Sequence, residues 1–129
     1  MAKDILLDTD IGTDVDDCLA LATILGSPEL RLVGVTTVYG DVLLRARMAQ
    51  RLLQLAERQD IPVHAGARLP LAGTRDIYWE GHEGQGLVDD GAELPEPGTD
   101  APGFIVETLR ARPGQVHLLA VGPLTNLAL

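Results

Sequence analysis

Short apolar segments alternate along this chain with longer segments whose apolar residues recur every three or four positions. The short segments are bounded by turn residues and predict strands; they are Asp4–Leu7, Arg31–Val38, Ile61–Ala65 and Val116–Val121. The longer segments predict helices; they are Asp16–Leu25, Leu43–Glu57, Phe104–Arg112 and the start of another, Leu124–Leu129. We expect the first two strands to be buried, the second on both faces. Alternating strands and helices predict an α/β fold, an open and mainly parallel Rossmann-like sheet with flanking helices.

Polar residues follow each predicted strand. The aspartate-rich segment Asp8–Asp17 follows the first strand, and Asp41 follows the second. His82 lies in the long segment after the third strand, and Gly122–Asn126 follows the fourth. In parallel α/β sheets, ligands bind beyond the carboxyl ends of the strands. We therefore expect these four groups to meet at one edge of the sheet and to form a site there.

The aspartate-rich segment is the best indicator of chemistry in the sequence. Five carboxylates fall within ten residues: Asp8, Asp10, Asp14, Asp16 and Asp17. Carboxylates this close repel one another unless water, backbone N–H groups or a cation neutralises them. Because all the candidate ligands are oxygens, the segment favours a hard cation, Ca²⁺ or Mg²⁺, over zinc.

The segment 66–103 is long for a connection within one domain. Connections longer than about 15 residues without regular structure are usually functional or disordered. This one is rich in glycine and proline and contains His82 and the only tryptophan, Trp79. A disordered insertion is one interpretation. We favour a mobile wall over the site, because Ile77–Trp79 supplies apolar side chains that can pack.

Composition places the chain among globular proteins and restricts its partners. Its 129 residues fit one domain, and its 46% of hydrophobic residues argues against disorder. The net charge of −9 argues against nucleic acid and anionic membranes as partners, since phosphate binding requires a basic surface. The single cysteine, Cys18, excludes an internal disulfide and is expected to pack as a small residue. Because the sequence has neither a signal-peptide pattern nor a membrane-spanning apolar run, we expect a cytoplasmic protein.

Two known aspartate motifs fit the segment poorly. An EF-hand loop that starts at Asp8 requires glycine at its sixth position and glutamate at its twelfth, where this chain has Thr13 and Leu19. A haloacid-dehalogenase-type phosphatase has D-x-D-x-[TV] after a strand, and here Gly12 stands where Thr or Val is expected. The EF-hand is excluded, and the phosphatase stays open as a less favoured alternative.

Four stretches, in order, resemble the inosine-uridine-preferring nucleoside hydrolase family. Asp8–Gly12 followed by Asp16-Asp17 resembles the family signature D-x-D-x-G-x-D-D, with two extra residues before the final pair. The others resemble the end of the family's second strand, its His-Gly-x-x-Gly-Leu loop and its Gly-Pro-Leu-Thr-Asn-Leu-Ala run; they are Val35–Asp41, His82–Leu87 and Gly122–Ala128. Together the four span nearly the whole chain. The resemblance implies Ca²⁺-dependent cleavage of the N-glycosidic bond of ribonucleosides, which yields ribose and the free base.

The same resemblance implies roles for the residues at the carboxyl ends of the strands. Asp10 would bind Ca²⁺ and act as the general base that deprotonates the attacking water. Asp17 and the backbone carbonyl of Val121 would be further metal ligands, and Asp8 would support Asp10 or the metal. Asp16 would form hydrogen bonds with the ribose hydroxyls.

Other polar residues have less direct roles. Asp41 stands where the family often has Asn, so its ribose contact would be altered. His82 would lie near the substrate as a catalytic and substrate-binding candidate, and a solvated loop histidine is the alternative. His64 and His117 fall in predicted strands and are expected to pack, and Asn126 is expected to cap or pack.

The length of the chain limits what the resemblance implies. Family members are more than twice as long, and the predicted helix at Leu124–Leu129 is barely one turn. We therefore expect residues 1–129 to form the amino-terminal part of a nucleoside hydrolase-like domain, with 66–103 as its active-site loop and with weak or absent activity. The alternative is a non-catalytic remnant that binds a cation or a sugar and self-associates. An uncovered strand at 116–121, at or near the sheet edge, favours a homo-oligomer, either a dimer or a tetramer.

Overall fold

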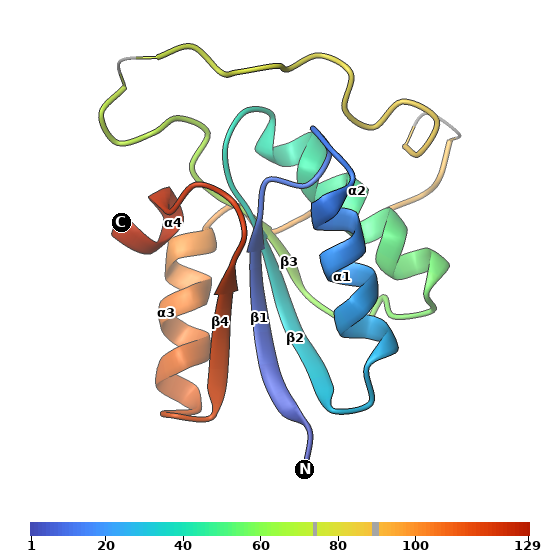
Figure 1. Cartoon of the computed structure of the whole chain (residues 1–129), viewed down its shortest axis with the longest axis vertical. Coiled ribbons are helices and arrows are strands. Elements are labelled where there is room, and N and C mark those ends of the chain that lie inside the picture. The colour runs from blue at the N-terminus through green and yellow to red at the C-terminus, as the bar shows by residue number, and fades with distance from the viewer. Residues whose placement is uncertain (74, 89–90) are drawn as a thin grey trace.

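In the part of the chain that the structure describes, four parallel strands form a single sheet that has helices on both sides (Figure 1). The computed structural model describes residues 1–73, 75–88 and 91–129. In chain order the elements are β1 (Lys3–Thr9), α1 (Asp16–Gly26), β2 (Leu30–Thr37), α2 (Val42–Leu55), β3 (Val63–Ala65), α3 (Ala101–Ala111), β4 (Val116–Ala120) and α4 (Thr125–Ala128). The strands lie in the order β3-β2-β1-β4, and each neighbouring pair is parallel. The predicted open, parallel α/β fold is confirmed.

The side chains of β1 alternate between the two faces of the sheet, as the pleat of a strand requires. Ile5 and Leu7 belong to the main apolar core, together with buried side chains of α1, α2, β2 and β3. Leu6, which is fully buried, lies on the opposite face beside Phe104 of α3. By the same alternation, Asp4 and Asp8 lie on the α3 face.

A glycine in β2 allows α3 to approach the sheet closely. A Cβ atom at Gly34 would lie 2.6 Å from the ring of Phe104 and 3.0 Å from Leu6 Cδ1. The Phe104 ring also stacks on His64 of β3, with ring centroids 4.1 Å apart. His64 therefore packs, as predicted, and burial lowers the pKa of its imidazole.

Besides shifts of one or two residues at the ends of other elements, three predicted features differ from the structure. The helix expected at Phe104–Arg112 begins earlier, at Ala101, because Asp100 caps it by accepting a hydrogen bond from Gly103 N and because proline is tolerated in a first turn. The second strand is not buried on both faces throughout, since Arg31 at its amino end is exposed. His117 is exposed rather than packed, because no described element covers its side of the edge strand β4.

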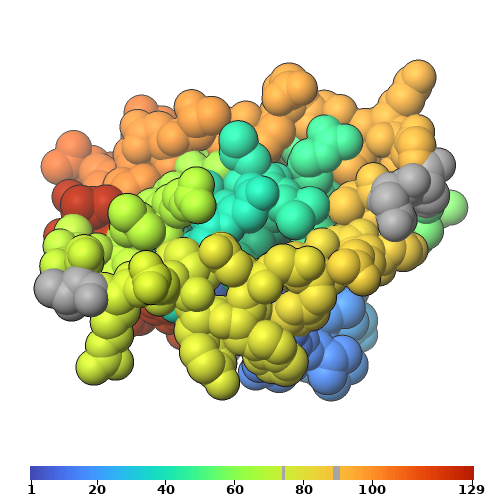
Figure 2. All heavy atoms as spheres, turned by 90° about the horizontal axis from the view of Figure 1, so that it is seen from above, coloured from blue at the N-terminus to red at the C-terminus, as the bar shows by residue number. Residues whose placement is uncertain are grey.

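The long segment between β3 and α3 arches over the carboxyl ends of the strands (Figure 1). Viewed from that end, atoms of this segment lie across the face, and atoms of the amino-terminal part of the chain emerge beside it (Figure 2). Among the described residues, no helix is both long enough and apolar enough to cross a membrane.

Candidate functional site at the carboxyl ends of the strands

Asp8, at the carboxyl end of β1, is completely buried on the α3 face. Its Oδ1 atom accepts hydrogen bonds from Thr36 Oγ1 at 2.6 Å and from Asn126 Nδ2 at 2.8 Å. Its buried Oδ2 atom accepts no hydrogen bond from any described residue. Burial raises the pKa of this carboxyl, and the two hydrogen bonds only partly oppose that effect. Asp8 is therefore held in place through one oxygen and has the other available.

Asn126 connects three segments that are distant in sequence. Besides its bond to Asp8, it donates to Thr37 O at 3.0 Å and accepts from Ala67 N at 2.8 Å. The side chain is 2% exposed, so these contacts replace water. The residue packs rather than faces solvent, which confirms its predicted role.

Asp17, in the first turn of α1, lies on the other face of the sheet. Its Oδ1 atom accepts a hydrogen bond from the hydroxyl of Thr9, the residue after Asp8 in β1. Burial, followed by the negative charges of Asp10, Asp16 and Asp14, raises the pKa of Asp17 to about 6. The hydrogen bond from Thr9 offsets only part of this rise. Among the described residues, no positive charge therefore neutralises the buried carboxyl of Asp17.

Among the described residues, one group of carboxylates is compact enough to hold a metal ion, and it comprises Asp14, Asp16 and Asp17. Their ligand atoms all lie within 4.8 Å of one another. Oxygens that bind one Ca²⁺ at about 2.3–2.6 Å can be up to roughly 5 Å apart, so the donor set fits this cation in chemistry and in size. The contact with Asp16 raises the pKa of Asp14, as does burial to a smaller extent.

Asp10 is close to this group without belonging to it. Burial raises its pKa, and it interacts electrostatically with both Asp16 and Asp17. Gly122 after β4 packs against it, since a Cβ there would lie 2.8 Å from Asp10 Oδ1. The neighbouring Val121 donates its backbone N–H to Asp8 O at 2.9 Å. The structure therefore brings the segment after β4 against the segment after β1, as predicted.

The predicted aspartates do not all belong to one compact group, although Asp10 interacts electrostatically with Asp8 as well as with Asp16 and Asp17. Asp10, Asp16 and Asp17 lie together with Asp14, for which the sequence suggested no role. Asp8 faces the opposite side of the sheet, because successive residues of a strand point to opposite faces. Asp41 is exposed and caps α2 by accepting a hydrogen bond from Leu44 N at 3.0 Å.

Arg45 of α2 is a site residue that the sequence analysis missed. It is 1% exposed and donates to the backbone carbonyls of Asp10 and, at 2.9 Å, of Ile11. It also donates to Thr13 Oγ1 at 2.9 Å. Two signals could have found it. It is a cation in the first turn of a helix, where the helix dipole disfavours positive charge, and it is three residues from the apolar position Met48.

His82 reaches the aspartate-rich segment from the long loop. Its Nε2 atom lies 2.7 Å from Thr13 O, and its ring is 5.0 Å from that of Trp79. The Oε1 atom of the neighbouring Glu83 lies 3.5 Å from Arg45 Nη2. Burial alone would raise the pKa of Glu83, but hydrogen bonds from backbone N–H groups and the charges of Arg45 and His82 outweigh it and hold that pKa below its usual range. His82 is partly buried, and its ring contacts the aspartate-rich segment.

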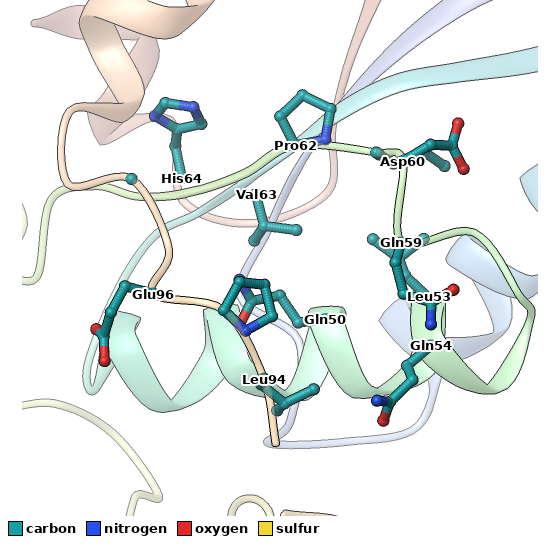
Figure 3. A pocket seen from close by; sticks show the side chains of 13 residues that line it. Gln50, Leu53, Gln54, Gln59, Asp60, Pro62, Val63, His64, Leu94 and Glu96 are labelled. Carbon is teal, nitrogen blue, oxygen red and sulfur yellow. The ribbon is translucent and has the colours of Figure 1, made fainter. Parts of the chain in front are cut away.

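A cavity of about 290 Å³ lies elsewhere, between α2, β3 and residues 94–98 (Figure 3). Gln50 and Gln54 of α2 line one side of it, and Asp60 and His64 lie across from them (Figure 3). Every predicted site residue is described by the structure, and none of them lines this cavity. Its presence therefore does not bear on the aspartate site.

Comparison with known proteins finds relatives that match nearly the whole chain. A family model described as inosine-uridine preferring nucleoside hydrolase matches residues 5–129. Pyrimidine-specific ribonucleoside hydrolase RihA of Enterobacter sp. (strain 638) is 42% identical over 136 residues, which cover 100% of this chain and 42% of the relative. Probable uridine nucleosidase 2 of Arabidopsis thaliana is 37% identical, with coverage of 98% of this chain and 41% of the relative.

Solved structures give the same result. A plant nucleoside hydrolase, PpNRh1, superposes with a TM-score of 0.74 at 33% identity and covers 99% of this chain but 42% of its own. The chain therefore spans about two fifths of the length of the relatives that it matches.

Proposed function

The chain belongs to the inosine-uridine preferring nucleoside hydrolase family, and we propose that its aspartate site serves calcium-dependent hydrolysis of the N-glycosidic bond of ribonucleosides. The observation that carries this proposal is the crowding of carboxylates around Asp17, whose pKa is raised to about 6 by burial and by neighbouring negative charge. Such a site favours a bound cation, and it favours a sugar on which positive charge develops during bond cleavage.

Asp17 is the proposed ligand common to two candidate sets. The family resemblance supports Asp10 and the Val121 carbonyl beside it, with Asp8 in a supporting position. The geometry supports Asp14 and Asp16, whose ligand atoms lie within 4.8 Å of each other and of Asp17. A bound Ca²⁺ would supply positive charge that makes a nearby water more acidic.

Asp10 is the proposed general base, because its partly buried carboxylate lies beside the proposed metal ligands and within electrostatic range of Asp16 and Asp17. In the reaction, the bond between the anomeric carbon and the base nitrogen breaks, its electron pair leaves with the base, and the base takes up a proton from solvent. The water oxygen bonds to the anomeric carbon, and Asp10 accepts a proton from that water. Asp16, which is exposed, would hold the ribose hydroxyls, and His82 would contact the substrate from the loop.

We expect the 129-residue chain by itself to bind calcium weakly and to hydrolyse nucleosides slowly or not at all. Few protein oxygens converge on the site among the described residues, so water must supply much of the usual coordination shell of six to eight oxygens. Asp41 is engaged in capping α2, so its contribution to ribose binding is proposed to be small.

Calorimetric titration with Ca²⁺ tests the metal site. The expected dissociation constant is on the order of 10⁻⁴–10⁻³ M. Asp17→Ala should abolish binding, while Asp10→Ala and Asp14→Ala form a matched pair that distinguishes the two ligand sets. Absence of binding by the wild-type chain at about 10 mM Ca²⁺, or full binding by Asp17→Ala, would refute the site.

Release of ribose from uridine and inosine tests the reaction. These nucleosides are chosen because the relatives' names refer to uridine and to pyrimidine ribonucleosides and the family name to inosine. Any hydrolysis should require Ca²⁺ and should be lost in Asp10→Asn. Rapid hydrolysis that persists in a chelator would contradict the proposal.

A second candidate is a binding protein that self-associates without catalysis. The apolar side chains exposed on β4, after it and on α4 favour it; they include Leu119, Val121, Leu124 and Leu127. Light scattering distinguishes a monomer from the dimer or tetramer proposed from the sequence. The family match favours both candidates over a phosphatase. We also propose a cytoplasmic location for the protein.

A further inference from the structure

Arg45 connects the two segments that form the aspartate site. Its buried guanidinium donates to the carbonyls of Asp10 and Ile11 and to the hydroxyl of Thr13, which are all in the turn between β1 and α1. It also donates to Tyr39 O at 2.7 Å, which attaches it to the end of β2. Only a planar guanidinium with five fixed donors can serve so many acceptors at once.

The same guanidinium reaches the long loop through Glu83. Arg45 Nη2 lies 3.5 Å from Glu83 Oε1, and the two side chains are 1% and 5% exposed. The family motif has glycine at this position, and glycine cannot make the contact. The buried ion pair is thus a property of this chain and not of the motif.

Glu83 in turn holds the backbone that carries His82. Its Oε2 atom accepts hydrogen bonds from Gly81 N at 2.7 Å and from His82 N at 3.0 Å. The Nε2 atom of the His82 ring lies 2.7 Å from Thr13 O. A closed path of contacts therefore leads from the aspartate turn through Arg45 and Glu83 to His82 and back.

We propose that Arg45 is a positioning residue that acts through Glu83 to place His82 over the aspartate turn. This proposal rests on the proposed function, because placing His82 matters for catalysis only if His82 contacts the substrate. It does not require the chain to bind metal, since every contact in the path is between protein atoms.

Amide hydrogen exchange measured by NMR on the whole chain tests this path. In Glu83→Gln, one oxygen and the charge are lost, so exchange at Gly81 and His82 should accelerate by about fivefold or more. Exchange at Ile11, whose N–H is bound by Thr9 Oγ1, should stay within about twofold, because Arg45 keeps its carbonyl contacts. In Arg45→Met, exchange should accelerate at all three amides.

Arg47→Met is the matched control, because residues two apart on a helix face different directions. It should leave all three amides unchanged. If Arg45 only supports the aspartate turn, Arg45→Met would accelerate exchange at Ile11 and leave Gly81 and His82 unchanged; if Glu83 does not hold the loop, Glu83→Gln would leave Gly81 and His82 unchanged. Either result overturns the proposal. If Arg45→Met does not fold, Arg45→Lys takes its place in the same comparison, because lysine keeps the charge but lacks the guanidinium's several fixed donors. Failure of calcium binding would refute the proposed function without altering this readout.

Discussion

The two ends of β1 hold buried carboxylates in opposite electrostatic situations. At the amino end, Asp4 is 5% exposed. Its carboxylate accepts hydrogen bonds from Arg31 Nε at 2.6 Å and from Arg112 Nη1 at 2.8 Å. The hydrogen bond from Arg31 is the largest influence on the Asp4 carboxyl and, with the contribution of Arg112, outweighs burial, so the pKa lies below its usual value. This carboxylate is neutralised by the protein itself.

At the carboxyl end, the carboxylates have no such partners among the described residues. The pKa values of Asp8, Asp10 and Asp17 are all raised, chiefly by burial. The charge of the nearby Arg45 offsets part of the rise in the pKa of Asp10, but its guanidinium donates to backbone carbonyls and to Glu83 rather than to these aspartates. A paired carboxylate stabilises a fold, whereas a cluster of unpaired ones is suited to an external cation. Four experiments can break or sharpen this contrast.

Calcium should raise the stability of the wild-type chain more than any substitution discussed here. A ligand that binds only the folded state at 100 times its dissociation constant adds about 2.7 kcal/mol to the free energy of unfolding. Urea unfolding at pH 7 with Ca²⁺ and with a chelator measures the difference. Asp4→Asn should retain the calcium response and Asp17→Asn should lose it; equal responses would remove the distinction between the two ends.

Asp4→Asn should lower the free energy of unfolding by roughly 1–2 kcal/mol, because it leaves two arginines without their carboxylate in a site where both are partly solvated. Denaturant unfolding at pH 7 measures it. Asp60→Asn is the control, since the Arg58–Asp60 pair is exposed and should contribute under about 0.5 kcal/mol. An effect no larger than that of the control would mean that Asp4 is not a structural carboxylate.

In metal-free protein, Asp17→Asn should change stability in the opposite direction from Asp4→Asn and raise the free energy of unfolding by about 1 kcal/mol. It removes a charge that burial and three neighbouring aspartates oppose, while the asparagine oxygen can still accept the Thr9 hydroxyl. The measurement is urea unfolding in chelator at pH 7. Destabilisation would show that Asp17 is already neutralised in the folded protein.

The stabilisation by Asp17→Asn should itself depend on pH. The folded pKa of Asp17, about 6, exceeds its ordinary value of 3.8, so the protonated wild type loses stability as pH rises through 6. The difference between variant and wild type should therefore shrink by under about 1 kcal/mol from pH 7 to pH 4.5. For Asp4 the sign reverses, because its pKa is lowered, and its contribution is lost only as pH falls below 3.8. A constant difference across this range would contradict the raised pKa of Asp17.

The long loop shows where prediction from sequence ended. Its position over the site follows from topology, because a segment after a parallel strand begins at the carboxyl edge. The attachment of His82 to Thr13 and of Glu83 to Arg45 joins residues 69 and 38 positions apart. Contacts of this range depend on how α2 and the loop pack, and no local pattern encodes them.

The alternation of apolar and polar residues by itself determined the parallel α/β sheet and the gathering of aspartates at its carboxyl edge, because strand and helix periodicities and the right-handed crossover leave few other arrangements. Tertiary structure decided which aspartates share a face. The pleat of β1 directs Asp8 toward α3 and Thr9 toward Asp17. The turn into α1 places Asp14 beside Asp16 and Asp17, although the sequence analysis had assigned it no role. It also decided that Arg45 is buried among carbonyls, since only the folded backbone brings these acceptors together.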